Sequence, residues 1–221
     1  MATAGRPCPA PTLLHLPFTG RWTVQNSPAN HVPSHGSHLF GTTYAIDFVS
    51  VDGRGRSGPP GWRSLLSTEA PDIFRGFGAP VLAPASGTVV SVHDGEPDHE
   101  ARRSQPALVA YALTQAGRVR RGPDAIAGNH VVIGLGPSGP FVLLAHLRRG
   151  SVAVAVGTDV GAGTVIGTCG NSGNSTEPHV HVQVTDTMHR PTCRGLPLAF
   201  RHPDGRPEPW LPRNGEVFSA E

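Results

Sequence analysis

Two histidines separated by a single residue offer the clearest chemistry in the sequence. His179 and His181 alternate with valines in the segment 179–184, which reads HVHVQV. Because successive side chains of a β-strand point to opposite faces, we expect both imidazoles and Gln183 on one face and the valines on the other. Neutral imidazoles bind metal ions, and they also exchange protons near neutral pH. Such a pair often only decorates an exposed strand, so a functional interpretation requires partners elsewhere in the chain.

Asp47 and His146 are the candidate partners of this pair. Asp47 lies among β-branched and aromatic residues in the segment 44–49, and His146 ends the apolar run 141–145. A buried carboxylate without a partner is energetically costly, so Asp47 is expected to meet either an arginine or a metal ion. One carboxylate and two imidazoles would hold zinc with three ligands and leave a position open for water. A lone histidine in an apolar strand is usually a core residue, but these residues together favour a shared site.

The segments around these side chains predict short strands. The 28 Gly and 23 Pro of the chain favour turns and strands over a helical bundle. Clusters of β-branched and aromatic residues between Gly and Pro are typical of antiparallel strands. We therefore predict a mainly β fold with an antiparallel sheet core, in which the segments 79–84 and 87–92 form a hairpin. The other predicted strands lie in the segments 20–24, 43–49, 130–133, 141–146, 164–167 and 179–184.

Two stretches interrupt this strand pattern. The segment 52–72 is rich in Gly and Pro and is expected to form an exposed loop. The segment 94–127 is rich in charged residues and Ala, which favours an insertion with one small helix near 104–121. At 221 residues, the chain suits one globular domain with such appended loops.

Charge and composition exclude several classes of protein. The net charge is +2 and all 18 basic residues are Arg, so nothing indicates a nucleic-acid partner, and chemistry that needs Lys is impossible. The cysteines Cys8, Cys169 and Cys193 lack CxxC spacing, so neither a disulfide framework nor a Cys-ligated zinc site is expected. The start of the chain lacks the apolar region of a signal peptide, and no run of about 18 apolar residues predicts a membrane span.

Four blocks of sequence carry a resemblance to a known family. They are HLFGTTYAIDF (38–48), PVLAPASGTVV (80–90), AHL followed by GS (145–147 and 150–151), and GTCGNSGNSTEPHVH (167–181). In these blocks and in their order, the chain resembles the M23 family of zinc metallopeptidases, of the lysostaphin or LytM type. The resemblance covers about residues 20–187. It implies an antiparallel β-sheet core of the lysostaphin/LytM type and cleavage of peptide bonds in peptidoglycan cross-links or stem peptides.

The resemblance also implies a role for each candidate residue. His38, Asp47 and His181 would bind one zinc ion per chain, while His146 and His179 would be unligated catalytic histidines. Zinc lowers the pKa of a bound water towards about 7, which makes a nucleophile available at neutral pH. One catalytic histidine would take the proton of that water, and the other would stabilise the oxyanion or protonate the leaving amine. Which histidine has which role stays open.

The first zinc ligand is the position where the sequence departs from the family. Its common first motif is a compact HxxxD, whereas eight residues separate His38 from Asp47 in this chain. His35 and His31 stand nearby and offer the same ligand chemistry. We expect His38 to be the ligand and keep His35 as the second choice.

Three other interpretations were weighed against an active peptidase. A catalytically inactive LytM-type domain, which binds the cell wall or activates another hydrolase, would usually lack one or more ligands, whereas all five positions are filled here. A biotinyl or lipoyl carrier domain needs a Lys, which the chain does not have. A non-haem iron enzyme uses the same ligand types, so metal analysis must separate it from a zinc enzyme.

Domain organisation follows from the extent of the resemblance. We expect an N-terminal segment (1–19), a peptidase domain (20–187) with insertions at about 52–72 and 94–127, and a C-terminal surface tail (188–221). The expected partner is a peptide or peptidoglycan substrate. A cell-wall substrate would place the protein outside the cytoplasm, but no export signal is visible in the sequence, so location and oligomeric state stay open.

Overall fold

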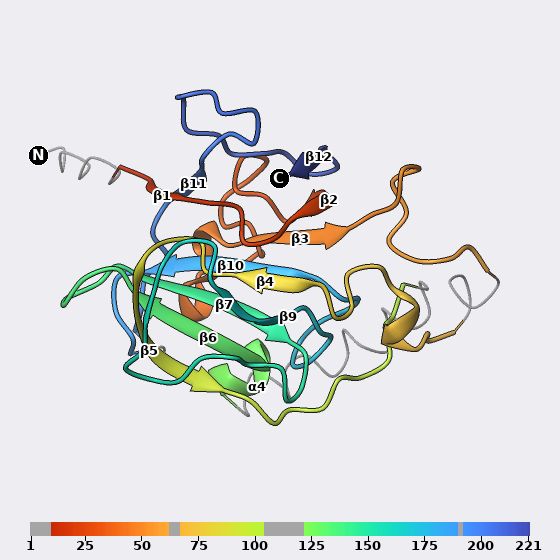
Figure 1. Cartoon of the computed structure of the whole chain (residues 1–221), viewed down its shortest axis with the longest axis horizontal. Helices are drawn as coiled ribbons and strands as arrows, with labels where there is room; N and C mark the ends of the chain where they lie inside the picture. Colours follow the sequence, from red (N-terminus) through yellow and green to blue (C-terminus); the bar gives the residue numbers. More distant parts are fainter. Residues whose placement is uncertain (1–9, 62–66, 104–121, 190–191) are drawn as a thin grey trace, which may run out of the picture.

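An eight-stranded antiparallel sheet is the main feature of the computed structural model, which describes residues 10–61, 67–103, 122–189 and 192–221. The strand order is β12-β2-β3-β10-β7-β6-β5-β8 (Figure 1). These strands are β2 (Gly20–Gln25), β3 (Ile46–Ser50), β5 (Gly87–His93), β6 (Asn129–Gly134), β7 (Phe141–Leu147), β8 (Asp159–Val160), β10 (Val180–Thr185) and β12 (Val217–Ala220). The prediction of a mainly β fold with an antiparallel core is confirmed.

Smaller elements complete the described part of the chain. β4 (Pro80–Leu82) pairs antiparallel with β9 (Val165–Thr168), and β1 (Thr12–Leu14) pairs parallel with β11 (Leu198–Phe200). The helical segments are η1 (Leu39–Tyr44), η2 (Pro71–Ile73) and α4 (Pro123–Ala127). Among these described elements, no helix has the length and apolar character needed to cross a membrane. The helix predicted near 104–121 lies outside the described residues.

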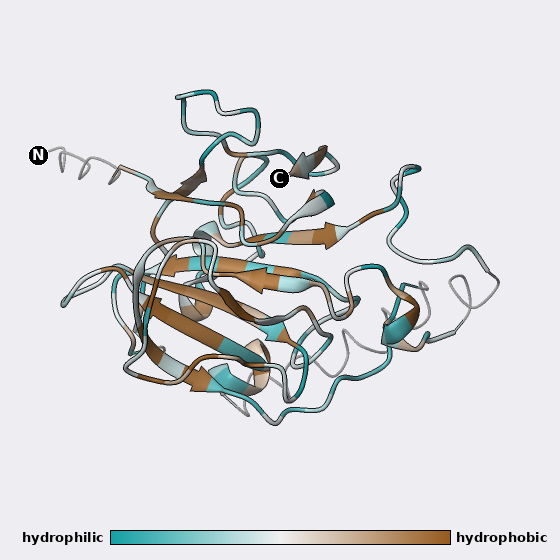
Figure 2. Ribbon diagram, viewed as in Figure 1, coloured by the Kyte–Doolittle hydropathy of each residue, from teal (hydrophilic) through white to brown (hydrophobic). Residues whose placement is uncertain are grey.

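The two faces of the main sheet have different characters. On β10, Val180 and Val182 are fully buried in the main core, and this core also contains Val81 of β4 and Ile166 of β9. The β4–β9 pair therefore covers one face of the sheet. Figure 2 shows hydrophobic residues along the sheet strands, and burying each such side chain contributes about 1.5–3 kcal/mol. The opposite face carries the polar side chains of β3 and β10, so the site is built on the face away from the main core.

The predicted hairpin between the segments 79–84 and 87–92 is wrong. β4 pairs with β9 in a separate sheet, whereas β5 pairs with β6 and β8 in the main sheet. The backbone amides that a hairpin would need have other partners, because Leu82 N donates to Pro17 O (2.8 Å) and Ala83 N donates to Thr164 O (2.8 Å). Pro84 has no amide proton to add. Long-range pairing thus replaces the local pairing that the sequence suggested.

The last residues of the chain add strands to the fold, although the sequence suggested a surface tail. β12 pairs with β2, where Phe218 lies opposite Trp22, and β11 pairs with β1. Phe200 is fully buried, and its ring lies 5.3 Å from that of Phe48 in an edge contact. Apolar side chains in this segment therefore close one end of the core.

Candidate metal centre

The strand register brings predicted residues together in the middle of the main sheet. β10 lies between β3 and β7, and its residue His181 pairs with Asp47 on one side and Ala145 on the other. Residues paired in this way point to the same face. His179 lies directly before β10, and two residues along a strand restore the same face. Asp47, His179 and His181 consequently share the polar face of the sheet.

His146 reaches this face only because the backbone of β7 departs from a regular strand there. Since Ala145 is the residue paired with His181, regular alternation would point His146 into the main core. Its φ of 61° is in the left-handed region, which is uncommon for a residue other than Gly. The turned side chain lies with its ring centre 4.6 Å from that of His179 and 5.7 Å from that of His181.

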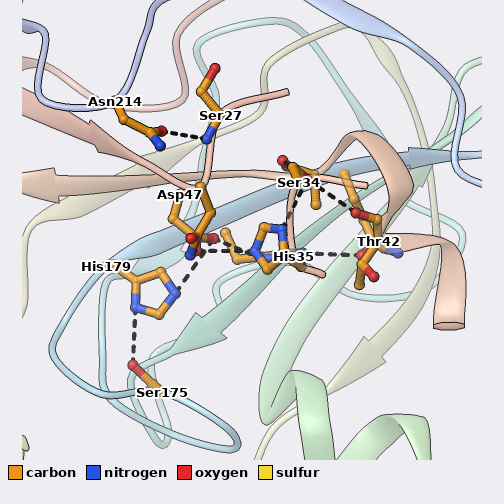
Figure 3. Close-up of polar contacts among 12 residues, drawn as sticks. Ser27, Ser34, His35, Thr42, Asp47, Ser175, His179 and Asn214 are labelled. Carbon is orange, nitrogen blue, oxygen red and sulfur yellow. Dashed lines mark hydrogen bonds and ion pairs between the residues drawn. The ribbon is translucent and has the colours of Figure 1, made fainter. Parts of the chain in front are cut away.

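His35 is the second choice of the sequence analysis, and the structure places it beside Asp47. Its Nε2 lies 3.1 Å from Asp47 Oδ2, and its ring centre lies 4.9 Å from that of His181. The neighbouring Ser34 holds the loop, since its amide donates to Thr43 O (3.0 Å) and its hydroxyl donates to Ala45 O (2.6 Å). Figure 3 shows Asp47 between His35 and His179.

His38, the ligand expected from the sequence, lies outside both groups of candidate ligands in the described residues. Its side chain is exposed, and its Nδ1 lies 3.0 Å from Thr43 Oγ1. His31 is also exposed. The hydrogen bonds that anchor Ser34 bring the next side chain to Asp47, while Gly36 at φ 72° turns the chain away before His38 is reached. No spacing rule in the sequence distinguishes the three histidines.

The protonation of three of these histidines can be assigned from their hydrogen bonds. His146 Nδ1 faces Ser172 O at 2.9 Å, and His179 Nδ1 faces Glu177 O at 2.8 Å. A carbonyl only accepts, so both Nδ1 atoms carry the proton. The Ser34 hydroxyl already donates to Ala45 O, so it accepts from His35 Nδ1 (3.1 Å). Each ring therefore turns the lone pair of its Nε2 into the site.

This pattern of lone pairs leaves a position that fits a cation. The lone pair of His35 Nε2 faces a carboxylate oxygen of Asp47 at 3.1 Å, and His179 Nε2 lies 3.6 Å from the other oxygen. Two acceptors facing each other repel unless a proton or a metal ion lies between them. His181 Nδ1 also lies 2.8 Å from Asp47 Oδ1. The donor set of imidazole nitrogens and one carboxylate is the set that zinc prefers.

Two groups of side chains in the described residues have the ligand atoms for a metal ion. One group contains His35, Asp47 and His181, and the other contains His146, His179 and His181. In each group the ligand atoms lie within 4.8 Å of one another. Only the first group includes a carboxylate beside its imidazoles.

The charge of Asp47 is maintained by its neighbours. Burial alone would raise the pKa of this carboxyl, but the adjacent imidazoles of His35, His179 and His181 hold the pKa well below its usual range. Asn26 Nδ2 also donates to Asp47 Oδ2 at 2.7 Å. Asn26, which no sequence pattern singled out, directly follows β2 with a φ of 50° that Asn tolerates. Asp47 is thus an anion whose environment favours positive charge.

His146 has the opposite electrostatic environment. Burial is the main cause that lowers the pKa of this imidazole well below its usual value, and the neighbouring His179 and His181 lower it further. Asp47 and the hydrogen bond to Ser172 O raise it, but they do not compensate. His146 is therefore neutral at physiological pH and can accept a proton.

The cluster lines a cavity of about 370 Å³. Ile126 and Ala127 of α4, together with Leu143 of β7, contribute apolar surface to its wall. The amides of Gln25 and Asn174 contribute polar groups at other points of the lining. A cavity with apolar walls and a few polar groups is typical of a ligand site. The histidines are thus accessible to a bound molecule.

One protein-family model matches part of the chain. The model of peptidase family M23 matches residues 67–192, a range that includes His146, His179 and His181, whereas His35 and Asp47 precede it. A search of curated proteins gave no match.

Solved structures of M23 proteins are also similar to the chain. The catalytic domain of a mutant of the prophage-encoded M23 protein EnpA from Enterococcus faecalis is 20% identical, with a TM-score of 0.39 over 69% of this chain and 73% of that one. The catalytic domain of the antimicrobial peptidase lysostaphin from Staphylococcus simulans is 19% identical, with a TM-score of 0.37 over 72% of this chain and 86% of that one. The M23 metalloprotease pseudoalterin from the deep sea is 14% identical, with a TM-score of 0.46 over 96% of each chain. Because the family model matches more than half of the residues of this chain, the chain belongs to peptidase family M23.

Proposed function

We propose that this protein is a zinc-dependent endopeptidase with one zinc ion held by His35, Asp47 and His181. The observation that carries the proposal is the convergence of imidazole lone pairs on a buried carboxylate, where His35 Nε2 and His181 Nδ1 lie 3.1 and 2.8 Å from the Asp47 oxygens. Membership of a peptidase family supports hydrolysis as the reaction.

The remaining histidines supply proton transfer. When bound, zinc would polarise the substrate carbonyl and lower the pKa of a water molecule. His146 and His179 present their Nε2 lone pairs on the same side of the site, with ring centres 4.6 Å apart. One of them accepts the proton of the attacking water and, once protonated, donates it to the leaving amine. The other donates to the developing oxyanion when it is protonated.

The substrate class follows from the family. We propose that the protein cleaves peptide bonds in peptidoglycan, either in cross-links or in stem peptides, and that it acts where this polymer lies, outside the cytoplasm. An open cavity of about 370 Å³ beside the histidines is large enough for a short stretch of peptide.

Metal content and cleavage of defined peptides test the proposal together. The purified full chain is analysed for metal by mass spectrometry and is then incubated with purified peptidoglycan and with synthetic cross-link and stem peptides. We expect about one zinc per chain and one defined cut bond, identified by mass spectrometry of the products.

Each other outcome is informative. Zinc binding without cleavage of any of these substrates would favour the inactive LytM-type domain. Iron in place of zinc would favour an oxygenase, and a protein that binds no metal at all would refute the proposal.

A further inference from the structure

Gln183 is the side chain behind His181, on the side away from Asp47. It follows His181 by two residues on β10, so both point to the same face, and both are buried. His181 Nε2 lies 3.0 Å from Gln183 Oε1, while its Nδ1 lies 2.8 Å from Asp47 Oδ1. One ring thus bridges the carboxylate and the amide.

The orientation of the Gln183 amide is fixed by a third segment. Gln183 Nε2 donates to the carbonyl of Phe40 at 2.9 Å. A flipped amide would set two oxygen acceptors against each other, so the amide must turn Oε1 to His181. An amide oxygen only accepts, and His181 Nε2 must therefore carry the proton.

The backbone of η1 is shaped to deliver this carbonyl. Phe40 and Gly41 have φ values of 55° and 79°, and the non-Gly Phe40 carries the strain of that conformation. A Cβ on Gly41 would lie 2.5 Å from Thr185 Cγ2 and 3.4 Å from Gln183 Nε2. The turn therefore packs directly on β10, and only Gly allows this approach.

We propose that Gln183, oriented by Phe40 O, is a positioning residue: its Oε1 accepts a hydrogen bond from His181 Nε2–H, which holds the ring in the tautomer that turns the Nδ1 lone pair to the metal. Outer hydrogen bonds of this kind fix the ring orientation and the tautomer of a metal-binding histidine. The same bond ties η1, which follows the His35 loop, to the strand that carries His181. The inference rests on the proposed zinc site.

Zinc affinity, measured by competition with a chelator, tests the proposal. Gln183→Met keeps the length of the side chain but removes both hydrogen bonds, and we expect its zinc affinity to fall about 10–100-fold. Gln183→Glu keeps an acceptor for His181 Nε2 but sets an oxygen against Phe40 O, so it should recover only part of that loss. Thr185→Val is the control, because Thr185 is also buried on the same face of β10 and donates only to Thr187 O. This control should bind zinc like the wild type.

A second measurement does not depend on a variant. In the zinc-loaded wild type, the imidazole ¹⁵N spectrum of His181 should show a protonated Nε2 and a metal-bound Nδ1. The inference is overturned if folded Gln183→Met binds zinc as tightly as the wild type, or if the spectrum shows Nε2 on the metal. If the wild type binds no zinc, the proposed function itself is wrong. That outcome is therefore distinguishable from a failure of the inference on Gln183.

Discussion

At the scale of single residues, the site is organised by which ring nitrogen each histidine turns inward. The Nδ1–H groups of His146 and His179 donate hydrogen bonds to backbone carbonyls, and that of His35 donates to the Ser34 hydroxyl, which itself donates to Ala45 O. The carbonyls come from the loop 170–178, which precedes β10. Because these acceptors are backbone groups or anchored by backbone, the inward lone pairs are preorganised before any metal binds.

The choice between His35 and His38 is the first prediction at this scale. His35→Ala should lower zinc affinity by at least about 100-fold, more than the loss of an outer hydrogen-bond partner causes. His38→Ala should bind zinc normally, because this side chain is exposed and its Nδ1 faces Thr43 Oγ1, away from Asp47. Chelator competition on both variants measures the difference. The opposite ranking would reinstate His38 as the ligand.

The second prediction concerns the two histidines outside the assigned ligand set. His146→Ala and His179→Ala should each lower kcat by about 10²–10⁴-fold, the range that general acid–base catalysis contributes. Each should keep about one zinc per chain, because the ligand group of His35, Asp47 and His181 remains. Steady-state kinetics and metal analysis on the same samples check both parts. Loss of zinc in either variant would move that histidine into the ligand set.

At the scale of elements, the site depends on how closely α4 and the loop 170–175 approach each other. A Cβ on Gly173 would lie 2.4 Å from Gly128 N and 2.6 Å from Ile126 O, at the end of α4. Asn174 N donates to Ile126 O (2.8 Å), and Ser172 O accepts from His146. The contact of this loop with α4 therefore supports the orientation of the His146 ring.

The third prediction tests this contact with a pair of glycines. Gly173→Ala, at φ 69°, should destabilise the protein by about 1–3 kcal/mol through overpacking and should also lower kcat. Gly150→Ala is the control: Gly150 has φ 70°, and a Cβ added there has no neighbouring atom within 4 Å, so the variant carries only the backbone strain. Urea unfolding and kinetics on both variants separate the two effects. If Gly173→Ala and Gly150→Ala had the same free energy of unfolding and the same kcat, the packing of α4 on the loop would be unimportant for the site.

At the scale of the whole molecule, one metal ion would join segments that are far apart in the sequence. His35 and Asp47 come from the first quarter of the chain, whereas His181 lies on β10, in the last quarter of the chain. A metal bound by all three crosslinks the folded state and not the unfolded chain. Zinc at 100 times its Kd would stabilise the fold by about 2.7 kcal/mol.

The fourth prediction is the pH dependence of this stabilisation. For a chain of this size, zinc should raise Tm by roughly 5–10 °C at pH 7.5. The increment should shrink as the pH falls from 7.5 to 5, because protons compete with the metal for the ligand nitrogens. The lowered pKa of Asp47 keeps this carboxylate ionised above pH ~4. Its own contribution is therefore present throughout this window and is lost only in stronger acid.

Thermal unfolding of the zinc-loaded and chelator-treated protein between pH 5 and 8 measures this increment. Asp47→Asn is the matched variant, because it removes the anionic ligand at nearly constant volume and should abolish the increment at every pH. An increment that does not change between pH 8 and 5 would contradict the assignment of imidazole ligands.

The sequence by itself determined the parts that follow from local pattern. Alternating valines made β10 a strand and placed His179 and His181 on one face, and Gly and Pro punctuation predicted the mainly β fold. Asp47 was indicated as a partner because a carboxylate in an apolar segment needs a counter-charge. These inferences succeed because strand alternation and the cost of a buried charge depend only on neighbouring residues.

Only the tertiary structure decided the features that depend on distant contacts. The hydrogen bonds of Ser34 bring His35 to Asp47 and leave His38 exposed, and the left-handed φ of His146 reverses the face that alternation would give it. Long-range pairing separates β4 from β5 and brings β12 to β2. Each outcome is set by partners more than a few residues away, whose positions exist only once the chain has folded, so no local pattern could have contained them.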